Sequence, residues 1–114
     1  MAKQNSEILE ANGVRLNLET REISCDGIQV DVTPVEFDTL EILVRSAGQV
    51  IPAGELTRAL DRRHANPFEG NLKLHVNRLK SKLERGRRLI RIVEGTGYLF
   101  MAADEHGASS YQLA

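Results

Sequence analysis

The first third of the chain alternates between apolar and polar residues, which is the pattern of half-buried β-strands. Val14, Leu16 and Leu18 are separated by single polar residues, and the same alternation recurs twice more along this part of the chain. The pattern predicts about four short antiparallel strands over residues 7–32. Cys25 falls on an apolar position of the pattern, so we expect it to be a buried strand residue.

Two dipeptides in this region have the composition of tight β-hairpin turns. They are Asn12-Gly13 and Asp26-Gly27, and both positions of each pair tolerate the positive φ that a type I′ turn requires. A polar segment, 19–22, supplies a third turn. The N-terminal part of the chain is therefore predicted to be a β-meander.

A first helix is predicted to begin at Thr33. Thr33 can cap the helix, Pro34 suits the first helical position, and Glu36 completes a capping box. Apolar residues then recur at helical spacing until Gly48 ends the helix. These apolar residues are Phe37, Leu40, Leu43, Val44 and Ala47.

A second, shorter helix is predicted near residues 53–60, directly after Pro52, with Leu60 facing inward. The segment that follows it, 61–67, is polar and ends in Pro67. Because proline interrupts a helix, this segment is predicted to be a loop.

The third predicted helix, 68–85, carries the most informative pattern. Leu72, Val76, Leu79 and Leu83 are spaced by four, three and four residues, so they form one buried stripe. The rest of its surface is rich in Asn, Lys and Arg, which can contact base edges and phosphates in a major groove. These outward positions are Asn71, Lys73, Leu74, Asn77, Arg78, Lys80, Ser81, Lys82 and Arg85.

The last regular element is predicted to be a β-hairpin over residues 90–101, with its turn at 94–97. The glycines of that turn do not form a nucleotide-binding loop, because a third glycine is missing and the turn joins two strands. We therefore divide the chain into a linker or disordered N-terminus at 1–7, one domain at 8–101 and a flexible tail at 102–114.

Composition limits the classes of function. The 114 residues suit one domain with one modest core. The polar N-terminus, the lack of a long apolar run and the single cysteine lead us to expect a cytoplasmic protein. The net charge is -1, but residues 70–93 hold eight basic residues and one acidic residue, a net charge of +7. Such a segment is typical of polyanion binding, with a solvated helix face as the alternative.

Two other classes of function are less well supported by the sequence. An enzyme or a cofactor protein is not expected, because the sequence contains no metal-ligand cluster, nucleophile–base pair or phosphate loop. The carboxylates Glu36, Asp38 and Glu41 are interpreted as solvated helix surface, and His75 as a packed residue with a hydrogen bond. A single-stranded RNA module is disfavoured, since the few Phe and Tyr residues are scattered.

Four stretches of the sequence are similar, in order and at near-family spacing, to blocks of one protein family. The stretches are 33–40 (TPVEFDTL), 48–51 (GQVI), 72–83 (LKLHVNRLKSKL) and 92–100 (IVEGTGYLF). The chain thereby resembles the effector domain of the OmpR/PhoB class of bacterial response regulators. The resemblance implies an α+β winged helix-turn-helix with an N-terminal four-stranded antiparallel sheet, three helices and a C-terminal β-hairpin wing.

The resemblance also implies sequence-specific binding of promoter duplex DNA for transcription regulation. The helix 71–85 would enter the major groove, and the hairpin around 94–97 would follow the adjacent minor groove. Leu74, Asn77 and Arg78 would face bases. The recognition-helix set is Asn71, Lys73, Leu74, Asn77, Arg78, Ser81 and Lys82, and the backbone or wing set is Lys80, Arg85, Arg91, Gly95, Thr96 and Gly97.

Further partners are implied in the same way. The loop at 61–67 would face RNA polymerase, through Asp61, Arg62, Arg63 and His64. Family members usually bind direct repeats of DNA as head-to-tail dimers. A receiver domain and its histidine kinase would be partners of an excised fragment, whereas a stand-alone regulator would lack them.

Three charged residues are among those that differ from the residues usual in the family. Asp61 stands where an aromatic residue is common, Lys73 where Asp is usual, and Glu94 where a basic or neutral residue is often found. The two acids favour an alternative function, a protein-interaction winged helix with weak or no DNA binding. The basic segment 70–93 favours DNA binding.

Overall fold

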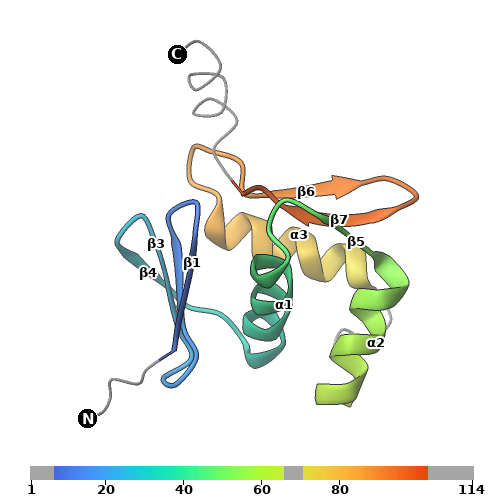
Figure 1. Ribbon diagram of the computed structural model, residues 1–114, viewed down its shortest axis with the longest axis horizontal. Coiled ribbons are helices and arrows are strands. Elements are labelled where there is room, and N and C mark those ends of the chain that lie inside the picture. Colours follow the sequence, from blue (N-terminus) through green and yellow to red (C-terminus); the bar gives the residue numbers. More distant parts are fainter. Residues whose placement is uncertain (1–6, 66–70, 103–114) are drawn as a thin grey trace.

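The computed structural model describes residues 7–65 and 71–102. Figure 1 shows an N-terminal sheet on one side of helix α1 and two further helices with a second sheet on the other. The first sheet contains β1 (Ile8–Ala11), β2 (Val14–Asn17), β3 (Glu22–Cys25) and β4 (Ile28–Val30). The remaining elements are α1 (Pro34–Arg45), β5 (Val50–Pro52), α2 (Ala53–Arg63), α3 (Leu72–Leu83), β6 (Ile90–Val93) and β7 (Gly97–Phe100).

The predicted β-meander is confirmed. The four strands pair in chain order and are antiparallel, and Leu16 lies between Leu9 and Ile23 in the register. Asn12 and Asp26 have φ values of 50° and 52°, and the glycine after each also has a positive φ. The turns that were predicted from two dipeptides therefore fix the register of the sheet.

Helix α1 lies at the centre of the fold and contacts α2, α3 and both sheets. Its predicted capping box is present. The Thr33 hydroxyl accepts a hydrogen bond from the Glu36 amide at 3.1 Å, and the Glu36 carboxylate accepts one from the Thr33 amide at 2.9 Å. The apolar stripe of α1 is buried, including Phe37 and Leu40 at 1% and 0% exposure. The helix therefore begins where the sequence predicts.

Helix α2 extends three residues further than predicted, so the prediction of a loop from residue 61 is wrong. Asp61, Arg62 and Arg63 form its last turn, and the backbone becomes extended only at His64. The basic residues Arg62 and Arg63 suit the negative end of the helix dipole. Pro67 and the rest of 66–70 lie outside the described residues.

Helix α3 ends at Leu83, two residues before the predicted boundary, and its predicted start at residue 68 lies outside the described residues. Asn71 caps its N-terminus by accepting a hydrogen bond from the Leu74 amide at 2.9 Å. At the other end, the Glu84 carboxylate accepts hydrogen bonds from the amides of Leu89 and Ile90, both at 2.8 Å. These two bonds turn the chain away from the helix axis and into β6.

The C-terminal hairpin is confirmed, but it belongs to a three-stranded sheet of order β5-β7-β6. Strand β5 was not predicted from the sequence. It has only three residues, one of them Pro52, and it exists because Ile51 and its neighbours pair with β7. Gly97 allows this close approach, since a Cβ there would overlap the carbonyl oxygen of Ile51.

One core joins all these elements. It includes the predicted stripe of α3 and the inner faces of both sheets, and Cys25 is buried in it as predicted. No helix in the described part of the chain combines the length and apolar character needed to cross a bilayer. The predicted N-terminal linker and C-terminal tail fall almost entirely outside the described residues.

Candidate nucleic-acid interface

Helix α3 has one buried face and one exposed face. Leu72, Val76, Leu79 and Leu83 are at most 9% exposed, and they attach the helix to the core. The opposite face is solvent-exposed, and Leu74 on it is 46% exposed. The other exposed positions between 71 and 83 are Asn71, Lys73, Asn77, Arg78 and Ser81.

His75 belongs to the buried side of α3. Its side chain contacts the Thr39 hydroxyl of α1, with 3.0 Å between Nε2 and Oγ1. The same hydroxyl donates to the Val35 carbonyl at 2.8 Å, so Nε2 carries the proton and donates to it. Burial lowers the pKa of His75, and the ring is neutral near pH 7. The interpretation of this residue as packed and hydrogen-bonded is confirmed.

Half of the basic side chains in the segment 70–93 are paired with acidic side chains. The partners of Lys73, Lys80, Lys82 and Arg87 are Glu94, Glu84, Glu36 and Asp26, with closest N–O distances between 2.6 and 3.1 Å. Three of these acids come from outside the segment. The local net charge of +7 counted along the sequence is therefore much reduced on the folded surface.

Lys80 has a structural role as well as a charge. Its ammonium lies 3.1 Å from Glu84 and donates to the Ile90 carbonyl at 2.7 Å, so it closes the connection between α3 and β6. Burial alone raises the pKa of Glu84. The amides of Ile90 and Leu89, together with Lys80, outweigh that effect and leave the pKa below its ordinary value. Lys80 was predicted as a DNA-backbone contact, and in this structure it is committed to this connection.

Lys82 joins α3 to the start of α1. Its Nζ lies 2.6 Å from Oε1 of Glu36, whose side chain is 5% exposed. Burial raises the pKa of Glu36, but the hydrogen bonds from Lys82 and the Thr33 amide outweigh this effect. The net pKa lies below its ordinary value, so the group stays ionised. The interpretation of Glu36 as solvated helix surface is wrong, because a lysine 46 residues away covers it.

The other four arginines of the segment are differently placed. Arg78, Arg85, Arg88 and Arg91 are exposed, and within the described ranges 7–65 and 71–102 they form no ion pair. Arg78 is on the exposed face of α3. Arg85 and Arg88 lie in the connection after that helix, and Arg91 lies on β6.

The wing turn contains no basic side chain. Glu94, Gly95 and Thr96 are exposed at its tip, whereas Gly97 is buried in β7 beside β5. Gly95 has a φ of 75°, which the turn requires. Glu94 accepts a hydrogen bond from Lys73 at 2.9 Å, which raises the pKa of that lysine. The wing thus contacts α3 through one acidic side chain.

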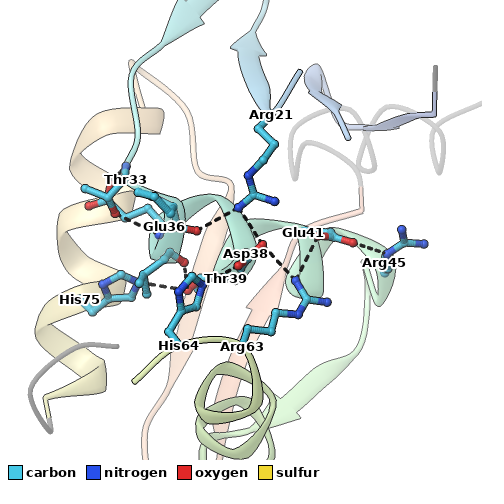
Figure 2. A network of polar contacts seen from close by, with 12 residues as sticks. Arg21, Thr33, Glu36, Asp38, Thr39, Glu41, Arg45, Arg63, His64 and His75 are labelled. Atoms are coloured by element: carbon cyan, nitrogen blue, oxygen red, sulfur yellow. Dashed lines mark hydrogen bonds and ion pairs between the residues drawn. The ribbon is translucent and has the colours of Figure 1, made fainter. Parts of the chain in front are cut away.

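A second polar cluster surrounds Asp38 on α1, as Figure 2 shows. The Asp38 side chain is 6% exposed and lies 3.0 Å from both Arg21 and Arg63 and 2.6 Å from Nε2 of His64. Burial raises its pKa, but the hydrogen bonds from His64 and Arg21 and the charges of the two arginines lower it below its ordinary value. Arg63 also contacts Glu41. The interpretation of Asp38 as solvated is wrong for this reason.

This cluster divides the residues that were assigned to the polymerase-facing loop. Arg63 and His64 point toward Asp38 and connect the end of α2 to α1. Asp61 and Arg62 are exposed on the last turn of α2. The sequence does not reveal the pairing, because Asp38 and its partners are separated by up to 26 residues.

The described residues hold no group of three or more His, Cys, Asp or Glu side chains arranged to bind a metal ion. Burial raises the pKa of Cys25, so its thiol is protonated at neutral pH. Depressions on the outer face of the N-terminal sheet are lined by mixed polar residues such as Arg15 and Ser24. The exposed face of α3 is therefore the most distinctive surface of this part of the chain.

An antiparallel sheet, three helices with an exposed third helix, and a C-terminal hairpin define the winged helix-turn-helix class. A family model described as "Transcriptional regulatory protein, C terminal" matches residues 27–100. The chain belongs to this family, the OmpR/PhoB-type DNA-binding effector domains of response regulators. Its function is DNA binding in transcription regulation.

Individual relatives agree with this assignment. The transcriptional regulatory protein CutR of Streptomyces coelicolor is 34% identical over 91 residues, which are 80% of this chain and 42% of CutR. The transcriptional regulatory protein CpxR of Escherichia coli is 30% identical over 101 residues, which are 86% of this chain and 44% of CpxR. The chain therefore spans less than half the length of these curated relatives.

Solved structures show the same fold. The DNA-binding domain of CpxR from E. coli superimposes with a TM-score of 0.70 at 29% identity, covering 85% of this chain and 98% of that domain. The RstA DNA-binding domain of Klebsiella pneumoniae, solved in complex with the RstA box, gives 0.66 at 20% identity, covering 84% and 98%. At that identity the second match shows the shared fold alone.

Proposed function

We propose that this domain binds duplex DNA with the exposed face of α3 in the major groove and the β6–β7 wing along the adjacent minor groove. Asn77 and Arg78 are the side chains we assign to base edges, with Leu74 against a thymine methyl group. Arg and Asn are the residue types that make bidentate contacts to guanine and adenine. The chain would act as the output domain of a two-component response regulator.

The observation that carries this proposal is the arrangement of α3. Its apolar stripe is buried in the core, so the helix is anchored with Asn77 and Arg78 outward. Between residues 71 and 83 there is no acidic residue, so no carboxylate on the helix itself would repel phosphate. An anchored helix with a polar, acid-free outer face is the geometry that major-groove recognition needs.

We assign the phosphate contacts to basic side chains other than Arg78. Arg85, Arg88 and Arg91 follow α3 and are exposed without an ion pair among the described residues. Lys80 and Lys82 are held by Glu84 and Glu36, so we assign them a structural contribution first. Phosphate contacts position a protein on the duplex, whereas base contacts give it specificity.

The decisive test is the substitution Arg78→Ala, measured by fluorescence anisotropy. The preferred duplex is first selected from a random library with the wild-type domain. Loss of a bidentate guanine contact is expected to weaken binding to that duplex by about 1–3 kcal/mol, with less effect on a mixed-sequence duplex. The matched control is Arg15→Ala, which removes an exposed arginine from the N-terminal sheet and should change neither affinity.

Unchanged affinity and unchanged sequence preference of Arg78→Ala would contradict the assignment of α3 as the recognition helix. Absence of wild-type binding to any duplex at low salt would favour the alternative function, a protein-interaction winged helix. The exposed acidic residues Asp61 and Glu94 favour this alternative.

Further partners complete the proposal. The exposed residues Asp61 and Arg62 at the end of α2 would face RNA polymerase, with Arg63 and His64 positioning them through Asp38. Binding to direct repeats as a head-to-tail dimer, regulation by a receiver domain and its histidine kinase, and a cytoplasmic location belong to the same proposal.

A further inference from the structure

The ion pair between Lys73 and Glu94 joins the first turn of α3 to the wing at a site where both partners are exposed. Nζ of Lys73 lies 2.9 Å from Oε2 of Glu94, and the two side chains are 54% and 75% exposed. An ion pair this exposed is weak and is screened by salt. The contact can therefore open without exposing any part of the core.

The other paired lysines near α3 differ in this respect. Lys80 and Lys82 are held by Glu84 and Glu36, whose side chains are only 17% and 5% exposed. Releasing either lysine would leave a largely buried carboxylate without its cation, which is costly. Lys73 is thus the lysine of the helix that can exchange its partner at low cost.

Lys73 is also placed where a competing anion would arrive. It precedes Asn77 by one helical turn on the exposed side of α3, and a hollow beside it is lined by the wing turn 94–97 and Tyr98. A duplex bound as proposed, by α3 and the wing, would bring its phosphates to this junction. A phosphate and the Glu94 carboxylate would then compete for one ammonium group.

We propose that Glu94 competes with the phosphates of the DNA backbone for Lys73. Glu94 holds Lys73 in the free protein and must release it before Lys73 can bind a phosphate. This inference rests on the proposed function. While the pair is closed, its charges cancel and attract the polyanion less. When it opens, a carboxylate remains next to the phosphates. Glu94 therefore restrains affinity for every duplex, whatever the sequence.

The substitution Glu94→Gln tests the proposal, with a mixed-sequence duplex as the probe and anisotropy between 50 and 200 mM salt as the measurement. Binding at 50 mM salt is expected to become roughly 3- to 10-fold tighter, because one phosphate contact is gained. The same contact makes the slope of log affinity against log salt concentration steeper by ~0.9. The gain in affinity is therefore about 3.5-fold smaller at 200 mM salt than at 50 mM salt.

Two controls separate the proposed exchange from a simple change of charge. Glu10→Gln removes a carboxylate from a comparable exposed pair with Arg15 on the N-terminal sheet and should leave the affinity unchanged. A double variant with Lys73→Met and Glu94→Gln should lose most of the gain, since the released ammonium is no longer present. All three substituted positions, Lys73, Glu94 and Glu10, are exposed, so circular dichroism should confirm native folding.

Three results would overturn the inference while wild-type binding is intact. These are an unchanged affinity and salt slope for Glu94→Gln, a full gain that persists in the double variant, and an equal gain for Glu10→Gln. Failure of the wild type to bind at 50 mM salt is a different result, which removes the proposed function itself and this inference with it.

Discussion

Arg87 shows how much one side chain contributes to the arrangement of the domain. Its Nε and Nη2 donate to the two carboxylate oxygens of Asp26 at 3.1 and 2.9 Å, and its Nη1 donates to Oδ1 of Asn12 at 2.7 Å. Nη2 also donates to the Asn12 carbonyl. The planar guanidinium matches this set of acceptors, as an ammonium cannot. Arg87 thus joins both tight turns of the N-terminal sheet to the loop after α3.

The substitution Arg87→Ala is expected to lower the free energy of unfolding by about 1–3 kcal/mol, as measured in urea, because charged hydrogen bonds are lost. Arg87→Lys should recover only part of this loss. Arg88→Ala is the matched control, since Arg88 is the next residue and its side chain is exposed. Its free energy of unfolding should stay within about 0.5 kcal/mol of the wild-type value. Equal effects of the two alanine substitutions would contradict the role given to Arg87.

At the scale of the elements, the C-terminal sheet depends on the close approach of β5 and β7. Gly97 pairs with Pro52 across these strands, and a Cβ at position 97 would overlap the Ile51 carbonyl. Strand β5 leads directly into α2, so the sheet also sets where α2 begins. A change at Gly97 should therefore affect the wing and α2 together.

We expect Gly97→Ala to destabilise the domain by about 1–3 kcal/mol through overpacking, measured as the change in the free energy of unfolding. Gly54→Ala in the first turn of α2 makes a useful contrast, because only the flexible end of Arg58 lies near a Cβ there. That change should stabilise the domain by about 0.5–1 kcal/mol, since alanine favours a helix over glycine. A stability of Gly97→Ala equal to that of the wild type would show that β5 can move away.

Patterns in the sequence predicted most of the elements, but not all of their lengths. The strands of the first sheet, the capping box at Thr33 and the buried stripe of α3 follow from local periodicity and turn chemistry. The last turn of α2 was missed because its polar sequence has no apolar position to mark it. Strand β5 was missed because three residues have no periodicity, and pairing with β7 alone makes them a strand.

For the whole molecule, buried and partly buried titratable groups on α1, on α3 and directly after α3 couple stability to pH. Burial lowers the pKa of His75, so as the pH falls the unfolded chain takes up a proton at a higher pH than the folded chain does. Stability is then full above the ordinary histidine pKa of about 6.5 and is lost as the pH falls below it. Glu36, Asp38 and Glu84 have lowered pKa values despite burial, so their contribution is present above about pH 4 and is lost at lower pH.

Urea unfolding between pH 7.5 and 5.0 tests the contribution of His75. The wild type should lose stability as the pH falls through this range, and His75→Gln should lose less, because it has no proton to take up there. His64→Gln is the control, because it makes the same substitution at the other histidine of the described residues. If the difference between the wild type and His75→Gln stayed constant across the range, the linkage to His75 would be absent.

The sequence by itself determined the class of fold and the face of α3 that points outward. Apolar spacing decides which side of a helix is buried, and turn residues decide where strands reverse, so both properties are local. The sequence could therefore predict that Asn77 and Arg78 lie on the outer face. The DNA contacts assigned to them remain predictions.

Only the tertiary structure decided which charges are available on that face. Lys82 is paired with Glu36 of α1, Lys73 with Glu94 of the wing and Arg87 with Asp26 of the first sheet. These partners are 21 to 61 residues apart in the chain, so no local pattern pairs them. Charge acts through space rather than along the sequence, and for this reason the counted charge of a segment differs from the charge that its folded surface presents.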